Sequence, residues 1–139
     1  MRVQPIPDAW IELVIRILEE GDGMAVEWTT RARQQWAQFG REQNAYELLL
    51  TVLRQPGILG HQVVGMLDRR DGTHCECWEF LCPHPWGSTV ALYAKIGVHH
   101  SRLHINLFSL HVDDGTERLA KAIVEYKKAH KVGNKTKKR

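Results

Sequence analysis

Several features that mark large protein classes are missing from this sequence. No apolar run approaches the roughly 18 residues that a transmembrane helix needs, so we expect no membrane partner. The opening residues, MRVQPIPDAW, lack the basic-then-apolar order of a secretory signal, which favours a cytoplasmic protein. The three cysteines are an odd number and do not indicate a disulfide framework. A Gly-rich phosphate loop, a serine-nucleophile motif and an HExxH motif are also absent, and we expect neither cofactor nor metal.

The residues that are present fit one soluble globular domain. Of 139 residues, 43% are apolar, 25% are charged and five are tryptophans, so the chain can bury a core without metal or disulfide support. We predict a single domain over residues 1–131, in which residues 1–22 add an extra N-terminal helix. Residues 132–139 are expected to form a basic, disordered tail.

The net charge of +3 combines two unlike parts of the chain. Residues 118–139 hold nine Lys or Arg and one acid, whereas residues 1–117 hold ten basic and fifteen acidic residues. A basic helix and tail would attract a phosphate backbone, and salt would weaken that attraction. The alternative is a solvated helix face and a solubilising terminus.

The hydrophobic pattern changes from helical periodicity to alternation near Gly60. Asp8 is the expected N-cap of the first helix, and Thr29 or Thr30 that of the second. Helices are expected at residues 8–20, 29–38, 44–54 and 115–131, and strands at 24–28, 62–67, 75–82, 89–98 and 102–112. This order predicts an α+β domain whose antiparallel sheet of four to five strands has its helices packed on one face.

The strand at 89–98 alternates cleanly between apolar and polar positions. Its even-numbered residues are apolar and should face the helices, which leaves Tyr93 and Lys95 on the outward face. A tight hairpin through residues 99–100 would place Lys95 and Tyr93 beside His104, Asn106 or Phe108.

The next strand breaks its alternation at Leu107 and Phe108, two adjacent large apolar residues. One β-bulge there would restore the pattern and turn Ser109 and His111 to the outward face. The residues expected to share that face are Tyr93, Lys95, His104, Asn106 and His111.

This set of side chains suits the cleavage of RNA without a metal. Such cleavage needs a base for the 2′-OH proton, a cation beside the pentavalent phosphate and an acid for the leaving 5′-oxygen. Histidine serves as base or acid near neutral pH, lysine supplies fixed charge, and tyrosine donates a proton or stacks on a base. The alternative is that these are ordinary solvent-facing residues of a strand.

Several segments also resemble the RelE/ParE toxin superfamily over about residues 25–128. In order, they are VEWTTRARQQWAQF, ELLLTVLRQPGILGHQVVGML, ECWEF, ALYAKI and HINLFSLHVDDGTERLAKAIVEYKK. The last is most similar to HigB-type members. Residues 93–96, Tyr-Ala-Lys-Ile, are similar to the Tyr-x-Lys-Ile strand of MqsR-type toxins, with Trp78 upstream at nearly the same spacing.

The resemblance implies a RelE-like fold and the toxin of a bacterial toxin–antitoxin pair. Such toxins are mostly metal-independent endoribonucleases that cut mRNA, often on the ribosome, and a cognate antitoxin inhibits them. By this resemblance, Tyr93 matches the strand tyrosine, and His111 the basic or histidine residue that closes the last strand. Glu79 falls where an acid or amide stands on the second strand, and Lys95 supplies the central cation.

The leading hypothesis is therefore an mRNA-cleaving hydrolase. Lys95 would stabilise the transition state, His111 or His104 would act as base or acid, and Tyr93 would assist. Glu79 is an alternative base. The residues expected to hold RNA are Arg102, Lys127, Lys128 and Lys131.

Other interpretations stay open. Val90 stands where many RelE members have an arginine, which favours a non-catalytic module that binds nucleic acid or protein, or a gyrase-inhibiting ParE-like toxin. Trp86, in a turn, could stack on a base or anchor its loop. Cys75, Cys77, Cys82 and His84 could hold zinc, but their spacing favours free, buried or half-buried thiols.

Overall fold

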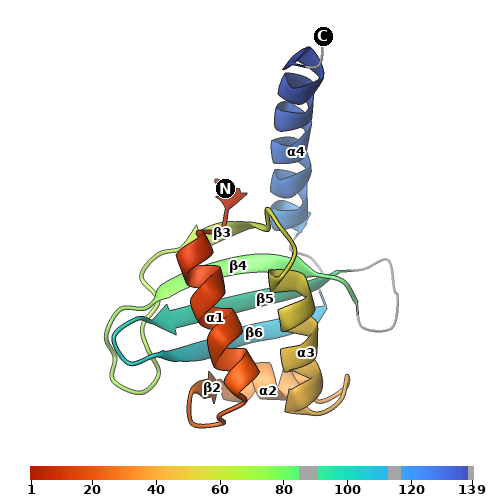
Figure 1. Cartoon of the computed structure of the whole chain (residues 1–139). Coiled ribbons are helices and arrows are strands. Elements are labelled where there is room, and N and C mark those ends of the chain that lie inside the picture. Colours follow the sequence, from red (N-terminus) through yellow and green to blue (C-terminus); the bar gives the residue numbers. More distant parts are fainter. Residues whose placement is uncertain (85–90, 113–116, 138–139) are drawn as a thin grey trace.

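The computed structural model describes residues 1–84, 91–112 and 117–137 of the chain (Figure 1). Ten elements follow one another: β1 (Gln4–Pro5), α1 (Asp8–Glu20), β2 (Val26–Trp28), α2 (Thr30–Trp36), α3 (Glu42–Leu53), β3 (Leu59–Val63), β4 (Glu76–Cys82), β5 (Leu92–His99), β6 (His104–Val112) and α4 (Glu117–Lys137). The expected α+β class is confirmed. Trp86 and Val90 lie outside the described residues.

The sheet has six strands in the order β1-β3-β4-β5-β6-β2 and is mixed, not purely antiparallel. β2 runs parallel to β6, with Val26 opposite Ile105 and Trp28 opposite Leu107. The expected antiparallel sheet of four to five strands is wrong here, because most of the chain separates β2 from β6 and leaves β2 free to join the edge in either direction. The parallel pairing buries Val26 and Trp28 beside apolar residues of β6.

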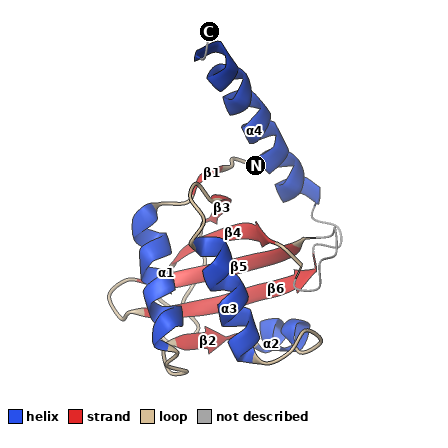
Figure 2. Ribbon diagram, turned by 45° about the vertical axis from the view of Figure 1, so that its right-hand side comes forward, coloured by secondary structure: helices blue, strands red, loops and turns tan. Residues whose placement is uncertain are grey.

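Helices α1 and α3 cover one face of the sheet (Figure 2). The buried stripe of α1 consists of Trp10, Val14, Ile17 and Leu18, at the spacing of one helix face. The N-cap of α1 is Pro7, so Asp8 lies in the first turn and is not the expected cap.

The second helix begins as the sequence predicts. The Thr29 side chain accepts a hydrogen bond of 3.0 Å from the Ala32 amide, which satisfies one of the free donors at the start of α2.

Helix α4 does not join α1 and α3. Leu119, near its start, packs with Val3 and Tyr93, and Tyr93 points to the sheet face opposite α1. From there α4 extends away from the sheet beside β3 (Figures 1 and 2). The expectation that the helices share one face is therefore wrong for α4, whose apolar residues seal a second, smaller core. The helix continues to Lys137, beyond the end expected near residue 131. In the described part of the chain, no helix is long and apolar enough to cross a membrane.

The bulge predicted at Phe108 is present. The register between β5 and β6 shifts between Lys95 and Ile96, so Ile96 pairs with Leu107 while Lys95 pairs with Ser109. Tyr93 then pairs with His111. The expected pairing of Lys95 and Tyr93 with His104, Asn106 or Phe108 is wrong. The hairpin turns at residues 100–103, with His99 opposite His104, and the bulge then moves the partners of Lys95 and Tyr93 one position further along β6.

Candidate functional site

Five polar side chains gather on the sheet face opposite α1 and α3. They come from four neighbouring strands and are called here the outer-face cluster: His61 on β3, Glu79 on β4, Tyr93 and Lys95 on β5, and His111 on β6. The ladder pairs His61 with Glu79, Glu79 with Lys95, and Tyr93 with His111. Because paired residues of adjacent strands point to the same face, the register itself brings these side chains together.

Glu79 is the central acceptor of the cluster. Its Oε1 lies 2.8 Å from Nδ1 of His61, and its Oε2 accepts a hydrogen bond from the hydroxyl of Tyr93. The carboxylate is only 8% exposed, so these two donors replace the water that it loses on folding. Glu79 therefore fixes the His61 ring and the Tyr93 hydroxyl at once. With both oxygens engaged, it is better placed to orient His61 than to serve as the alternative base.

The sequence did not point to His61. We expected the strand to begin at residue 62, after the hydrophobic pattern changes near Gly60, whereas β3 begins at Leu59. Gly60 lies inside the strand, where its lack of a side chain lets the neighbouring segments pack closely. A Cβ there would stand 2.7 Å from the Glu79 carbonyl oxygen and 2.8 Å from an Ile6 methyl group. The close approach of β1 and β4 at Gly60 is a tertiary contact that alternation does not show.

His111 closes the other side of the cluster. Its Nδ1 lies 2.7 Å from the carbonyl oxygen of Val112, and its ring centroid is 5.2 Å from that of Tyr93. A carbonyl oxygen only accepts, so Nδ1 carries the proton and Nε2 of the neutral ring keeps its lone pair. This arrangement prepares Nε2 of His111 to accept a proton.

Lys95 lies between the two histidines, on the central strand. The residue is half-buried. In the sheet it stands opposite Glu79 on β4 and opposite Ser109 on β6. Among the described residues, no carboxylate lies within ion-pair distance of the Lys95 ammonium group. The Glu79 carboxylate, by contrast, is bound to His61 and Tyr93. The charge of Lys95 is therefore available to an anion that reaches this face.

The cluster has an accessible part and a buried part. Glu79 and Tyr93 are each 8% exposed, and Leu119 and Val3 pack beside Tyr93. His61, Lys95 and His111 are half-buried, and the exposed fraction of the His61 side chain is 29%. The buried pair can position groups, and the accessible residues can touch a ligand.

His104, the other predicted acid or base, belongs to a different network. Its Nε2 is hydrogen-bonded to Oδ2 of Asp68, which also accepts a bond of 3.0 Å from the Asn106 side chain. Burial would raise the pKa of Asp68, but the hydrogen bonds from Asn106, the Arg70 amide and His104 outweigh it and lower the pKa to about 2. The loop between β3 and β4 thus covers this end of the face. His104 is only 3% exposed and does not meet Lys95.

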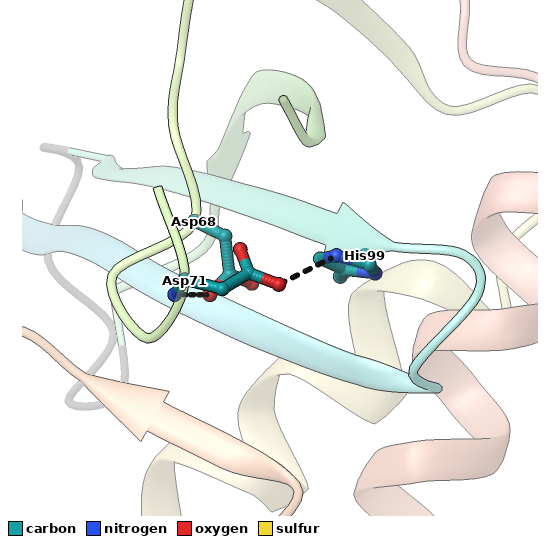
Figure 3. A group of neighbouring side chains, drawn as sticks. All are labelled: Asp68, Asp71 and His99. Atoms are coloured by element: carbon teal, nitrogen blue, oxygen red, sulfur yellow. Dashed lines mark hydrogen bonds and ion pairs between the residues drawn. The ribbon is translucent and has the colours of Figure 1, made fainter. Parts of the chain in front are cut away.

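Asp68, Asp71 and His99 form the one group in the described residues that is close enough to hold a metal ion (Figure 3). Their ligand atoms already lie close to other protein groups. Oδ1 of Asp68 accepts from the backbone amides of Arg70 and Asp71, and Oδ2 of Asp71 lies 3.2 Å from Nε2 of His99 and 3.1 Å from Nε of Arg102. The guanidinium of Arg102 places positive charge beside Oδ2 of Asp71, although this buried oxygen accepts no hydrogen bond from the described residues.

Among the described residues, no three of Cys75, Cys77, Cys82 and His84 bring their ligand atoms close enough together to hold a metal ion. Cys77 and Cys82 are buried and Cys75 is half-buried, all as free thiols, in line with the expectation. Burial raises the pKa of Cys75 to about 11 and that of Cys82 to about 12, which disfavours the thiolate that a metal binds. His84 packs edge-on against Phe39, at 5.3 Å between ring centroids.

The residues expected to hold RNA lie on two elements. Lys127 and Lys128 are exposed on α4, whereas Arg102 lies beside β6 and pairs with Asp71 while 59% of its side chain stays exposed. The side chain of Lys131 lies outside the described residues. The positive charge of α4 therefore stands apart from that of Arg102, at the β3 side of the sheet (Figure 1).

Comparison of the chain with family models, with curated proteins and with solved structures finds no match in any of the three.

Proposed function

We propose that the protein is a metal-independent endoribonuclease that cuts RNA at the outer-face cluster. One observation carries this proposal: His61 and His111 flank Lys95 on one sheet face, and a protein oxygen lies against Nδ1 of each ring. The transfer of a phosphoryl group to a neighbouring hydroxyl needs a base, an acid and a cation, and two oriented imidazoles and a lysine supply them.

The two histidines have different partners, which assigns their roles. The carbonyl partner of His111 leaves Nε2 with a lone pair, so His111 takes the proton of the 2′-OH. The 2′-oxygen then attacks phosphorus, the bond from phosphorus to the 5′-oxygen breaks, and a 2′,3′-cyclic phosphate forms. His61, whose Nδ1 faces the Glu79 carboxylate, donates a proton from Nε2 to the departing 5′-oxygen.

The other cluster residues support these proton transfers. The Lys95 ammonium group neutralises charge that grows on the phosphate oxygens in the transition state. Glu79 positions His61, and the hydroxyl of Tyr93 positions Glu79. This assignment replaces His104 with His61 as the partner of His111, because Asp68 holds His104 in the other network.

The natural substrate and partners are proposals of the same kind. The resemblance to RelE/ParE toxins favours mRNA as substrate, a cognate antitoxin as inhibitor and action on the ribosome. Exposed lysines on α4 support a polyanionic substrate, and binding should weaken as salt rises.

The test is cleavage of a defined single-stranded RNA by purified protein in excess chelator. We expect 2′,3′-cyclic phosphate ends, and a loss of about 100-fold or more in rate for His111→Ala, His61→Ala and Lys95→Ala. His74→Ala is the matched control, since His74 is an exposed histidine outside the cluster. Parent-like rates in the three cluster variants, with each protein folded, would refute the site.

A further inference from the structure

A cavity of about 390 Å³ opens beside the outer-face cluster. The end of α3, the start of β3, the end of β4 and the middle of α4 enclose it. Its apolar walls include Val52, Leu59, Leu81 and Ile123, and its polar groups include Gln55 and Lys127. Apolar walls with a few polar groups are typical of small-ligand sites, and this volume falls in their range.

The cavity continues the surface on which we place RNA. Leu81 is paired with Tyr93 on the neighbouring strand, and Leu59 lies two residues before His61. Two residues along a strand span roughly 7 Å, so the cavity begins one step along the sheet from the reacting groups. A nucleotide next to the one that is cut would reach it without a turn in the RNA.

We propose that this cavity binds a nucleobase next to the scissile phosphate. This inference rests on the proposed function. The flat base lies against Leu59, Leu81 and Ile123, which exclude water from its faces. The amide of Gln55 can donate to and accept from the edge of a base, and the ammonium group of Lys127 contacts the attached phosphate.

Charge separates this cavity from the neighbouring one. A second cavity, of about 360 Å³, lies across the loop of residues 55–58, where Asp8 and Glu12 contribute acidic side chains to its lining. Its lining also includes Arg54, so the two carboxylates outnumber its one positive charge and would repel a nucleotide, whereas the first cavity carries Lys127 and no acidic residue. A phosphorylated base therefore favours the first cavity.

The experiment is an NMR titration of the full chain with single 3′-mononucleotides, with nucleosides and with inorganic phosphate. We expect saturable shifts at the amides of Gln55, Leu59, Leu81 and Ile123 with mononucleotides, weaker shifts with nucleosides, and none there with phosphate alone. Shifts confined to the exposed lysines of α4, or equal effects of phosphate and mononucleotide, would overturn the inference.

Matched variants distinguish binding in the cavity from general electrostatic attraction of the nucleotide to α4. Lys127→Ala should weaken mononucleotide binding about tenfold, the effect of losing one charge-assisted hydrogen bond. Arg118→Ala removes the same charge from an exposed residue of the same helix, which does not line the cavity, and should have little effect. Equal losses in both variants would show that only the charge of α4 matters, and would refute the cavity as the site.

Gln55→Ala tests base recognition and keeps the two proposals distinguishable. In cleavage it should change which base is preferred and raise KM, with kcat unchanged. Mononucleotide binding at the cavity without any RNA cleavage would refute the proposed function alone. Cleavage without binding there would refute this inference alone.

Discussion

Replacing Glu79 by glutamine tests the centre of the candidate site. The Glu79 carboxylate accepts from Nδ1 of His61 and from the hydroxyl of Tyr93. A glutamine amide has one carbonyl oxygen, so it can accept from only one of these donors, and its NH2 group faces the other. His61 then either loses its partner or changes tautomer, and in both cases the ring loses the negative charge beside it.

The expected magnitudes follow from these two contacts. A hydrogen bond to a charged group contributes about 1.5–3 kcal/mol, so the loss of one should lower the free energy of unfolding by about 2 kcal/mol. For a chain of this length that corresponds to a fall in Tm of roughly 7 °C. Cleavage should slow by about 100-fold or more, because the proton donor is no longer oriented.

The assay combines thermal unfolding, single-turnover RNA cleavage and the nitrogen shifts of the His61 ring. Glu76→Gln is the matched control, since Glu76 lies on the same strand and bonds to His100 and Trp78 instead. If Glu79→Gln retained the parent Tm, cleavage rate and His61 tautomer, Glu79 would not organise the site and the mechanism would be wrong.

Three further predictions concern the fold that supports the site. Asp68→Asn should lower stability above about pH 4, because the ionised Asp68 carboxylate stabilises the parent protein there. The folded pKa of Asp68 is about 2, so the parent protein loses this stabilisation as pH falls toward 2, and the urea midpoints of the two proteins should converge in acid. Thr29→Ala should cost about 1–2 kcal/mol in urea unfolding, because the hydroxyl loses the bond from the Ala32 amide and its own bond to the Phe108 carbonyl oxygen, and Thr29→Ser should restore most of this stability. Deleting Phe108 removes the one extra residue of the bulge and should leave Ser109 opposite Lys95 and His111 opposite Tyr93, so RNA cleavage should persist; loss of cleavage in a deletion variant that folds would contradict the register.

Local sequence pattern determined much of the face that carries the candidate site. Side chains alternate along any strand, so the apolar even positions of β5 were enough to place Tyr93 and Lys95 on the outer face. The adjacent residues Leu107 and Phe108 break that alternation and indicated the bulge that brings His111 to the same face. The hydrogen bond from the Ala32 amide to the Thr29 side chain was equally local, whereas the bond from the same hydroxyl to the Phe108 carbonyl oxygen was not predictable from the helix.

Contacts between distant segments decided the rest. Gly60 lies in a strand because β1 and β4 approach it closely, and this places His61 against Glu79. His104 has the alternation of a site residue, yet the Asp68 side chain, 36 positions earlier in the chain, binds it and removes it from the cluster. The direction of β2 and the position of α4 likewise depend on which apolar surfaces of the sheet the other elements leave exposed. Alternation specifies which face of the sheet a residue occupies. The partner that the residue contacts on that face depends on strand order and on loops that fold over the sheet, and both depend on the packing of the whole chain.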